Sequence, residues 1–194
     1  LAHQFSYTIP LRRAESNIGF GDLALNYRYQ LLGDGDAALA ISPRVSLLLP
    51  SGDERRGLGT GATGVQVNLP VSLVVLPNLV THWNAGATFT PSARNDQRDR
   101  ASTHDFNLGQ SFIWQISSRF NAMLETVYNN VETVEGRRRT QREESLFISP
   151  GIRWAYNLAS DLQIVPGIAF PIGVGPSRGD WSLFLYLSFE HPFK

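Results

Sequence analysis

The chain has 194 residues and a formal net charge of zero, with 17 basic and 17 acidic residues. Sixteen of the basic residues are arginine and only Lys194 is lysine, unlike the lysine-rich surface of most soluble proteins, and no basic run suggests nucleic-acid binding. Cysteine is absent, which excludes disulfides and cysteine-ligated metal sites, and no apolar stretch is long enough for a membrane helix.

The first half of the chain alternates apolar and polar residues at the period of a β-strand. In the segment 64–76, for example, Val65, Val67 and Leu69 share one face, while Gln66 and Asn68 share the other. This alternation predicts five strands. They cover residues 2–11, 20–32, 38–50, 64–76 and 80–90.

The second half continues the same alternation, so that the chain as given is expected to form one domain over residues 1–194 with ten strands. Each segment is about as long as a tilted membrane strand, which needs roughly 9–11 residues or slightly more. The five later strands cover residues 104–116, 120–131, 145–158, 162–173 and 181–190.

The connections between these segments alternate in length. Long, charged ones lie at about 12–18, 51–63, 91–103, 132–144 and 174–180, and short ones at 33–37, 76–79, 117–119 and 158–161. Long outer loops and short periplasmic turns are typical of outer-membrane barrels, as are aromatic residues near both membrane interfaces. The predicted interface aromatics are Tyr29, Trp83, Trp114, Trp154, Tyr156 and Trp181.

Alternation alone does not say which face points outward, and a soluble barrel or sandwich with an apolar core would show the same pattern. The polar face has few charges and many small residues, such as Gly86 and Ser111, which suit the inside of a narrow barrel. We therefore expect an all-β, up-and-down antiparallel transmembrane β-barrel in the outer membrane of a Gram-negative bacterium. Its predicted lumen-lining residues are Asp22, Arg28, Arg44, His82, Asp105, Glu125, Arg153 and Glu190.

Two roles are open for the lumen charges. Glu125 and Arg153 lie at similar heights on neighbouring predicted strands and could form an ion pair. Together with Arg44, these charges would then either neutralise one another and close the lumen, or form a constriction that selects solutes by charge.

Other motifs give little sign of catalysis. The loop GLGTGATG (57–64) is followed by a strand and contains no lysine, so we expect a mobile or folded-in outer loop and no phosphate site. The four histidines have no metal-ligand spacing, and we expect no metal and no cofactor. His104 beside Asp105 is the only hint of a barrel-embedded lipid-modifying enzyme, and the chain is not expected to be an enzyme.

Three stretches carry a family resemblance: GFGDLALNYRYQLL (19–32), SPRVSLLLPSGD (42–53) and GLGTGATGVQVNLP (57–70). The glycine–aspartate strand opener, the L-P-S-G-D strand end and the G-x-G-x-G loop resemble the meta-pathway of phenol degradation family of outer-membrane proteins, of the "transporter" type. The match covers about 50 residues well. Chains of that family are usually longer at the N-terminus, which implies two further strands before Leu1 and twelve in all.

The resemblance implies an outer-membrane channel or transporter for passive, porin-like uptake of small molecules, aromatic or hydrophobic ones among them. The alternative is a closed structural or scaffold barrel whose loops bind a partner or lipopolysaccharide. Arginine-rich loops at 12–15, 53–56, 94–100 and 135–144 could bind lipid phosphates, or could be solvated loops of mixed charge. The expected partners are membrane lipids, lipopolysaccharide and a small solute, and the oligomeric state is left open.

Overall fold

The computed structural model describes residues 3–14, 17–33, 37–158 and 162–190 of the chain. These residues form β-strands and two short 3-10 helices, η1 (Glu54–Arg56) and η2 (Gly175–Ser177), and no α-helix. None of the helices in these ranges is long and apolar enough to cross a membrane. The contacts of the chain divide it into two compact units. Unit 1 comprises Leu1–Val71, Asn84–Leu108 and Asn129–Glu144, and unit 2 comprises Ser72–Trp83, Gly109–Tyr128 and Ser145–Lys194.

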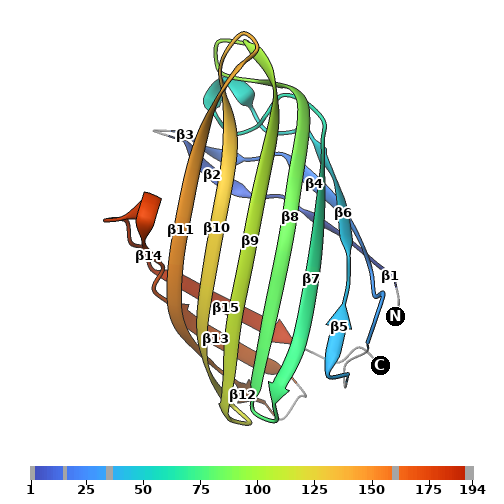
Figure 1. Cartoon of the computed structure of the whole chain (residues 1–194), viewed down its shortest axis with the longest axis vertical. Helices are drawn as coiled ribbons and strands as arrows, with labels where there is room; N and C mark the ends of the chain where they lie inside the picture. Colours follow the sequence, from blue (N-terminus) through green and yellow to red (C-terminus); the bar gives the residue numbers. More distant parts are fainter. Residues whose placement is uncertain (1–2, 15–16, 34–36, 159–161, 191–194) are drawn as a thin grey trace. The chain divides into compact units, whose positions relative to one another are not determined.

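The described residues contain fifteen strands, all of whose described pairings are antiparallel. Five of them are long or regular and lie side by side in Figure 1, in sequence order. These are β7 (Gly64–Leu76), β8 (Leu79–Arg94), β9 (Arg100–Ser117), β10 (Phe120–Gly136) and β11 (Arg139–Trp154). The others are β1 (His3–Thr8), β2 (Leu11–Ala14), β3 (Asn17–Phe20), β4 (Leu23–Tyr29), β5 (Leu39–Ile41), β6 (Arg44–Leu49), β12 (Tyr156–Asn157), β13 (Gln163–Ala169), β14 (Ile172–Gly173) and β15 (Phe184–Glu190).

Thirteen of these strands form one sheet, in which the path runs β1-β4-β6-β7-β8-β9-β10-β11-β13-β12 and β15 pairs with β13. Strands β2 and β3 form a separate hairpin. The all-β, antiparallel part of the prediction is therefore confirmed. Within the described ranges no pairing joins β1 to β15, so this ladder of strands does not close into a ring.

The observed strands differ from the ten predicted ones at two kinds of place. Proline divides predicted strands, since it lacks the N–H that a ladder needs: Pro10 separates β1 from β2, and Pro43 precedes β6. Conversely, most of the loops predicted at 91–103 and 132–144 is strand, because the β8–β9 and β10–β11 hairpins extend to turns at 95–99 and 137–138. Arg138, with a φ of 59°, makes the second of these turns tight.

A backbone irregularity shifts the alternation within β8. Ser92 has a φ of 56°, in the left-handed region. Thr90 and Ala93, three residues apart, are both 3% exposed, so the buried face changes phase between them. The residues after Ser92 therefore lie on the opposite face from the one that a regular strand would give them.

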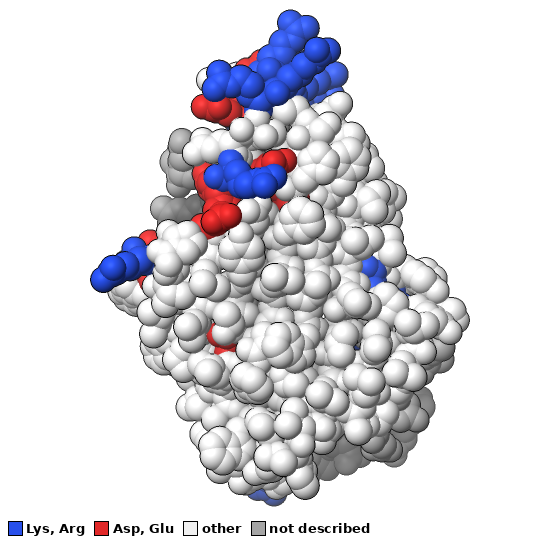
Figure 2. Space-filling model, viewed as in Figure 1, with Lys and Arg blue, Asp and Glu red and all other residues white. Residues whose placement is uncertain are grey.

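The distribution of polar and apolar residues is the reverse of that in a water-soluble protein. Among the described residues, eleven polar side chains are buried and only six hydrophobic ones are. Large hydrophobic residues are instead exposed along the strands, for instance Val67 at 48%, Phe106 at 55% and Trp114 at 57%. Figure 2 shows the same from outside: the visible face of the long strands has few charged atoms, and most of the arginine and acidic atoms in view lie toward the upper end.

Candidate functional site

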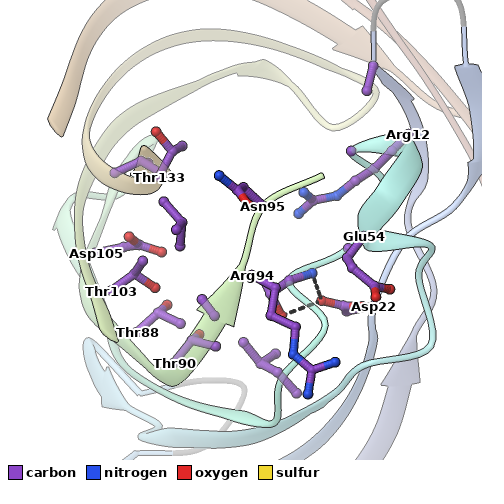
Figure 3. Close-up of a pocket in the computed structure, with 18 of the residues that line it drawn as sticks. Arg12, Asp22, Glu54, Thr88, Thr90, Arg94, Asn95, Thr103, Asp105 and Thr133 are labelled. Carbon is purple, nitrogen blue, oxygen red and sulfur yellow. Dashed lines mark hydrogen bonds between the residues drawn. The ribbon is translucent and has the colours of Figure 1, made fainter. Parts of the chain in front are cut away.

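The carboxylate of Asp22 holds a distant loop in place within unit 1. It accepts hydrogen bonds from the backbone N–H of Gly52 (2.9 Å), the N–H of Thr60 (2.8 Å) and the hydroxyl of Thr60 (2.8 Å). Figure 3 draws two hydrogen bonds to the labelled Asp22 as dashed lines. Hydrogen bonds to a charged acceptor are stronger than neutral ones. Asp22 therefore anchors residues 51–63, hereafter the anchored loop, to the start of β4.

Glycines allow the close approach on which this anchoring depends. A Cβ atom at Gly59 would lie 2.5 Å from Oδ1 of Asp22, and one at Gly52 would lie 2.6 Å from the carbonyl oxygen of Leu58. The side chain of Leu58 is only 2% exposed, and a Cβ at Gly19 would lie 2.8 Å from its Cδ1. Of the two forms predicted for the GLGTGATG loop, the structure shows the folded-in one.

The anchored loop is also tied to β3. Asp53 caps η1 by accepting from the N–H of Arg55 (3.0 Å), and Gly57 ends this helix with a φ of 69°. The guanidinium of Arg56 donates to Oδ1 of Asn17 (3.3 Å) and to the carbonyl of Ile18 (3.4 Å). The three sequence stretches that carry the family resemblance thus meet in one hydrogen-bonded cluster.

A cavity of about 720 Å³ lies beside the anchored loop, entirely within unit 1. Figure 3 shows Arg12 and Glu54 on the side of the loop and threonines of β8 to β10 on the other side, with Asn95 pointing into the space. Most of the residues that line it are polar, and they carry both charge signs. The labelled residues that line it are Arg12, Asp22, Glu54, Thr88, Thr90, Arg94, Asn95, Thr103, Asp105 and Thr133.

The polar face of β1, β4, β6 and β7 carries two rows of side chains in register. The first row consists of Ser6, Asn26, Ser46 and Gln66. Ser46, which is fully buried, donates to Oδ1 of Asn26 (2.7 Å), and Asn26 donates to Oγ1 of Thr8 (3.1 Å). Neutral amides and hydroxyls thus fill this row, and none of them is among the predicted lumen-lining residues, which are all titratable.

The second row consists of Gln4, Arg28, Arg44 and Asn68, hereafter the arginine row. Arg28 and Arg44 are register partners on neighbouring strands, and Arg44 donates to Oε1 of Gln66 (3.2 Å). The described ion pairs all involve other residues. Two of the predicted lumen residues are therefore brought together, without an acidic partner.

A second cavity of unit 1, of about 330 Å³, adjoins this row. Its lining includes Arg44, Asn68, Asn84, Asp105 and Asn107. Asn84 donates to Oδ1 of Asn68 (3.1 Å). A Cβ at Gly86 would lie 2.2 Å from Oδ1 of Asn68 and 2.3 Å from Oδ1 of Asn107, so glycine alone leaves room for both amides.

In unit 2, the predicted pairing of Glu125 with Arg153 does not occur. Arg153 instead lies near Asn121, four residues before Glu125 on β10. With the Asn121 amide oriented to match, its oxygen accepts from Nε (3.1 Å) and Nη2 (3.3 Å) of Arg153. His82 is bound through its Nδ1 to the hydroxyl of Ser72 at 2.7 Å. The side chain of Glu190 lies outside the described residues.

Five of the six predicted interface aromatics have exposed side chains. Their exposed fractions run from 37% at Tyr29 to 78% at Trp181, with Trp83, Trp114 and Tyr156 between these values. Trp154 is half-buried. The prediction requires such exposure, and the contact of these rings with lipid stays a prediction.

His104 and Asp105, the pair that suggested an enzyme, both interact with Glu132. His104 donates its backbone N–H to Oε2 of Glu132 (2.8 Å), Arg142 forms an ion pair with this glutamate, and Asp105 accepts from its N–H (2.9 Å). Burial raises the pKa of Glu132, but the His104 N–H and the Arg142 guanidinium outweigh burial, so the pKa lies below its usual value. Among the described residues, no three histidine or acidic side chains could hold a metal ion.

The fold and site define an all-β antiparallel protein with polar side chains buried and apolar ones exposed, a pattern compatible with an outer-membrane β-barrel. The family model described as "Putative MetA-pathway of phenol degradation" matches residues 3–174, and the chain belongs to this family. The resemblance found in the sequence is therefore confirmed. The comparison with curated proteins gives no match.

Proposed function

We propose that the protein is an outer-membrane β-barrel that allows passive passage of small molecules. The observation that carries this proposal is the reversed burial: an apolar face too extensive to be solvated and a polar face that is buried. Lipid is the solvent that such a face matches. The polar side chains would then line a lumen.

Closure of the sheet is part of the proposal. An open sheet edge leaves unpaired backbone N–H and C=O groups, which a bilayer does not tolerate. β1 and β15 carry such edges in the described part of the chain. We propose that these edges are satisfied by pairing in the closed barrel.

The proposed solute is a small molecule, aromatic or hydrophobic compounds among them. The family's description refers to phenol degradation, and the cavity of about 720 Å³ is in the size range of small-molecule sites. The anchored loop supplies residues such as Glu54 and Thr60 to the lining of this cavity. It would therefore restrict the size of the solutes that pass.

A second candidate function is a closed scaffold barrel that binds lipopolysaccharide through its loops. The supporting observation is the turn between β10 and β11, where Arg137, Arg138 and Arg139 are all exposed. Only Arg139 has an acidic partner among the described residues, Glu135 at 3.1 Å. Guanidinium groups of this kind bind phosphate in a bidentate manner.

Two experiments test these proposals. A shift in gel mobility between unboiled and boiled samples would show a closed barrel, and its absence would contradict one. Reconstitution in planar bilayers should then give stepwise conductance. A barrel that shows the mobility shift but no current, and that binds lipopolysaccharide less tightly after Arg137→Gln and Arg138→Gln, would replace the channel by the scaffold.

A further inference from the structure

We infer that the arginine row (Gln4, Arg28, Arg44 and Asn68) binds the carboxylate of a small monoanionic solute. This inference rests on the proposed channel function and names its preferred class of solute. It depends on three features of unit 1: the charge of the row, its unpartnered donors and the charge balance of the adjoining cavity.

The charge of the row is positive and uncompensated within it. Arg28 and Arg44 lie directly opposite one another, and neither forms an ion pair with a described residue. Like charges at directly opposite positions of two strands destabilise the pair. A bound anion removes this repulsion, whereas a cation or a neutral solute does not.

Two hydrogen-bond donors of the row are buried and have no partner among the described residues. They are Nε of Arg44 and Nδ2 of Asn68, on residues that are register partners and that both line the 330 Å³ cavity. Asn68 is only 7% exposed. Buried donors are nearly always satisfied in folded proteins, so a matching acceptor is expected here. A carboxylate has two acceptor oxygens, and guanidinium groups bind it especially well.

The charge balance favours a monoanion. Asp105 lines the same cavity and, although it accepts a hydrogen bond from the N–H of Glu132, it contributes a negative charge. Two arginines of the row and one aspartate leave one positive charge to be compensated. A multiply charged anion would be repelled by Asp105, and Asn84, whose Oδ1 is also buried and unpartnered, could accept from a neutral donor group elsewhere on the solute.

The test uses the full chain in planar bilayers, with a KCl gradient to measure charge selectivity. Benzoate, phenol and benzylammonium serve as aromatic probes of similar size and different charge. We expect a reversal potential on the anion-selective side, and block of the current by benzoate at lower concentration than by phenol or benzylammonium. Arg44→Gln should weaken benzoate block about tenfold, the loss expected for one strong charge-assisted hydrogen bond. Arg28→Gln and Arg44→Gln should each shift the reversal potential toward that of an unselective channel.

Two matched variants sharpen the result. Arg178→Gln removes one exposed arginine of the loop around η2 and should leave block and reversal potential unchanged. Arg44→Lys keeps the charge but not the planar fork, so it should keep the reversal potential and still weaken benzoate block. The mobility shift on gels identifies variants that fail to fold.

The failures can be told apart. Absence of any current from a folded barrel contradicts the channel itself. A current that is cation-selective or unselective, or that Arg28→Gln and Arg44→Gln leave unchanged, overturns the carboxylate site and leaves the channel standing. Equal block by benzoate and phenol overturns it as well.

Discussion

Asp22 accepts hydrogen bonds from both the backbone N–H and the hydroxyl of Thr60, 38 residues later in the chain. With the third bond, from Gly52, this carboxylate joins the opener of β4 to the anchored loop. This side chain therefore accepts three of the hydrogen bonds that hold the loop beside the 720 Å³ cavity. The first two predictions follow from this relationship.

Asp22→Ala should release the anchored loop. The loss of three hydrogen bonds to a charged acceptor is expected to cost about 2–4 kcal/mol of local stability. Trypsin should then cleave after Arg55 and Arg56 much faster than in the wild type, and single-channel conductance should rise. Asp53→Ala, which removes only the exposed cap of η1, should have a smaller effect, of about 1 kcal/mol. Equal cleavage rates in wild type and Asp22→Ala would show that the loop is held by other contacts.

Gly59→Ala should disturb the same contact from the other side. Its Cβ would lie 2.5 Å from Oδ1 of Asp22 and 2.8 Å from the backbone of Gly52, so the loop has to move, at a cost of about 1–3 kcal/mol. The protease assay should give a result close to that for Asp22→Ala. The matched control is Gly136→Ala, whose Cβ would meet only one atom, Oδ2 of Asp99, at 4.0 Å. Similar behaviour of the two alanine variants would rule out this steric explanation.

Neighbouring residues of β7 should respond oppositely to a charge. Val67 is 48% exposed on the apolar face, whereas the adjacent Gln66 lies on the polar face. Val67→Arg should make the free energy of folding into lipid vesicles less favourable by about 2–4 kcal/mol if the residue lies near the bilayer midplane. Gln66→Arg should leave this free energy nearly unchanged. Urea titration of refolding into vesicles measures both. Equal effects would contradict the assignment of the two faces.

Acidification should loosen the contact of Glu132 with His104 and Arg142, in the connection predicted at 132–144. The pKa of Glu132 is lowered in the folded protein, so its contribution to stability is complete above the ordinary value of 4.5 and is lost as the pH falls through the folded value. The protection factor of the His104 N–H, which corrects its exchange rate for the intrinsic pH dependence of amide exchange, should therefore fall in acid. Glu132→Gln should remove this pH dependence, and Glu135→Gln, which alters the exposed pair with Arg139, should preserve it.

The strand alternation predicts β7 well, since the expected range 64–76 is the observed one. Apolar and polar residues alternate there from Val65 to Leu69, with no proline or glycine among them. The ends of β8 to β11 could not be predicted, because charged residues occur both in loops and on the exposed faces of long hairpins. The positive φ of Ser92 could not be predicted either, because no glycine or asparagine in its place indicates a left-handed backbone there.

The candidate site was predicted in part. The polar-face positions of Arg28 and Arg44 follow from the alternation, but their pairing depends on the register between β4 and β6, which the alternation does not fix. For the same reason Arg153 contacts Asn121 and not Glu125. The role of Asp22 requires a contact between residues 38 apart, and only the family motifs suggested that these segments belong together.

The central claim is that the apolar face of the sheet contacts lipid. The chain has no cysteine, so a single introduced cysteine reports one position without ambiguity. Val67→Cys and Gln66→Cys, each labelled with a small fluorophore and folded into vesicles, can be compared with a nitroxide quencher in the lipid acyl chains. The account predicts strong quenching at position 67 and weak quenching at position 66. Quenching at neither position, or stronger quenching at position 66, would contradict it.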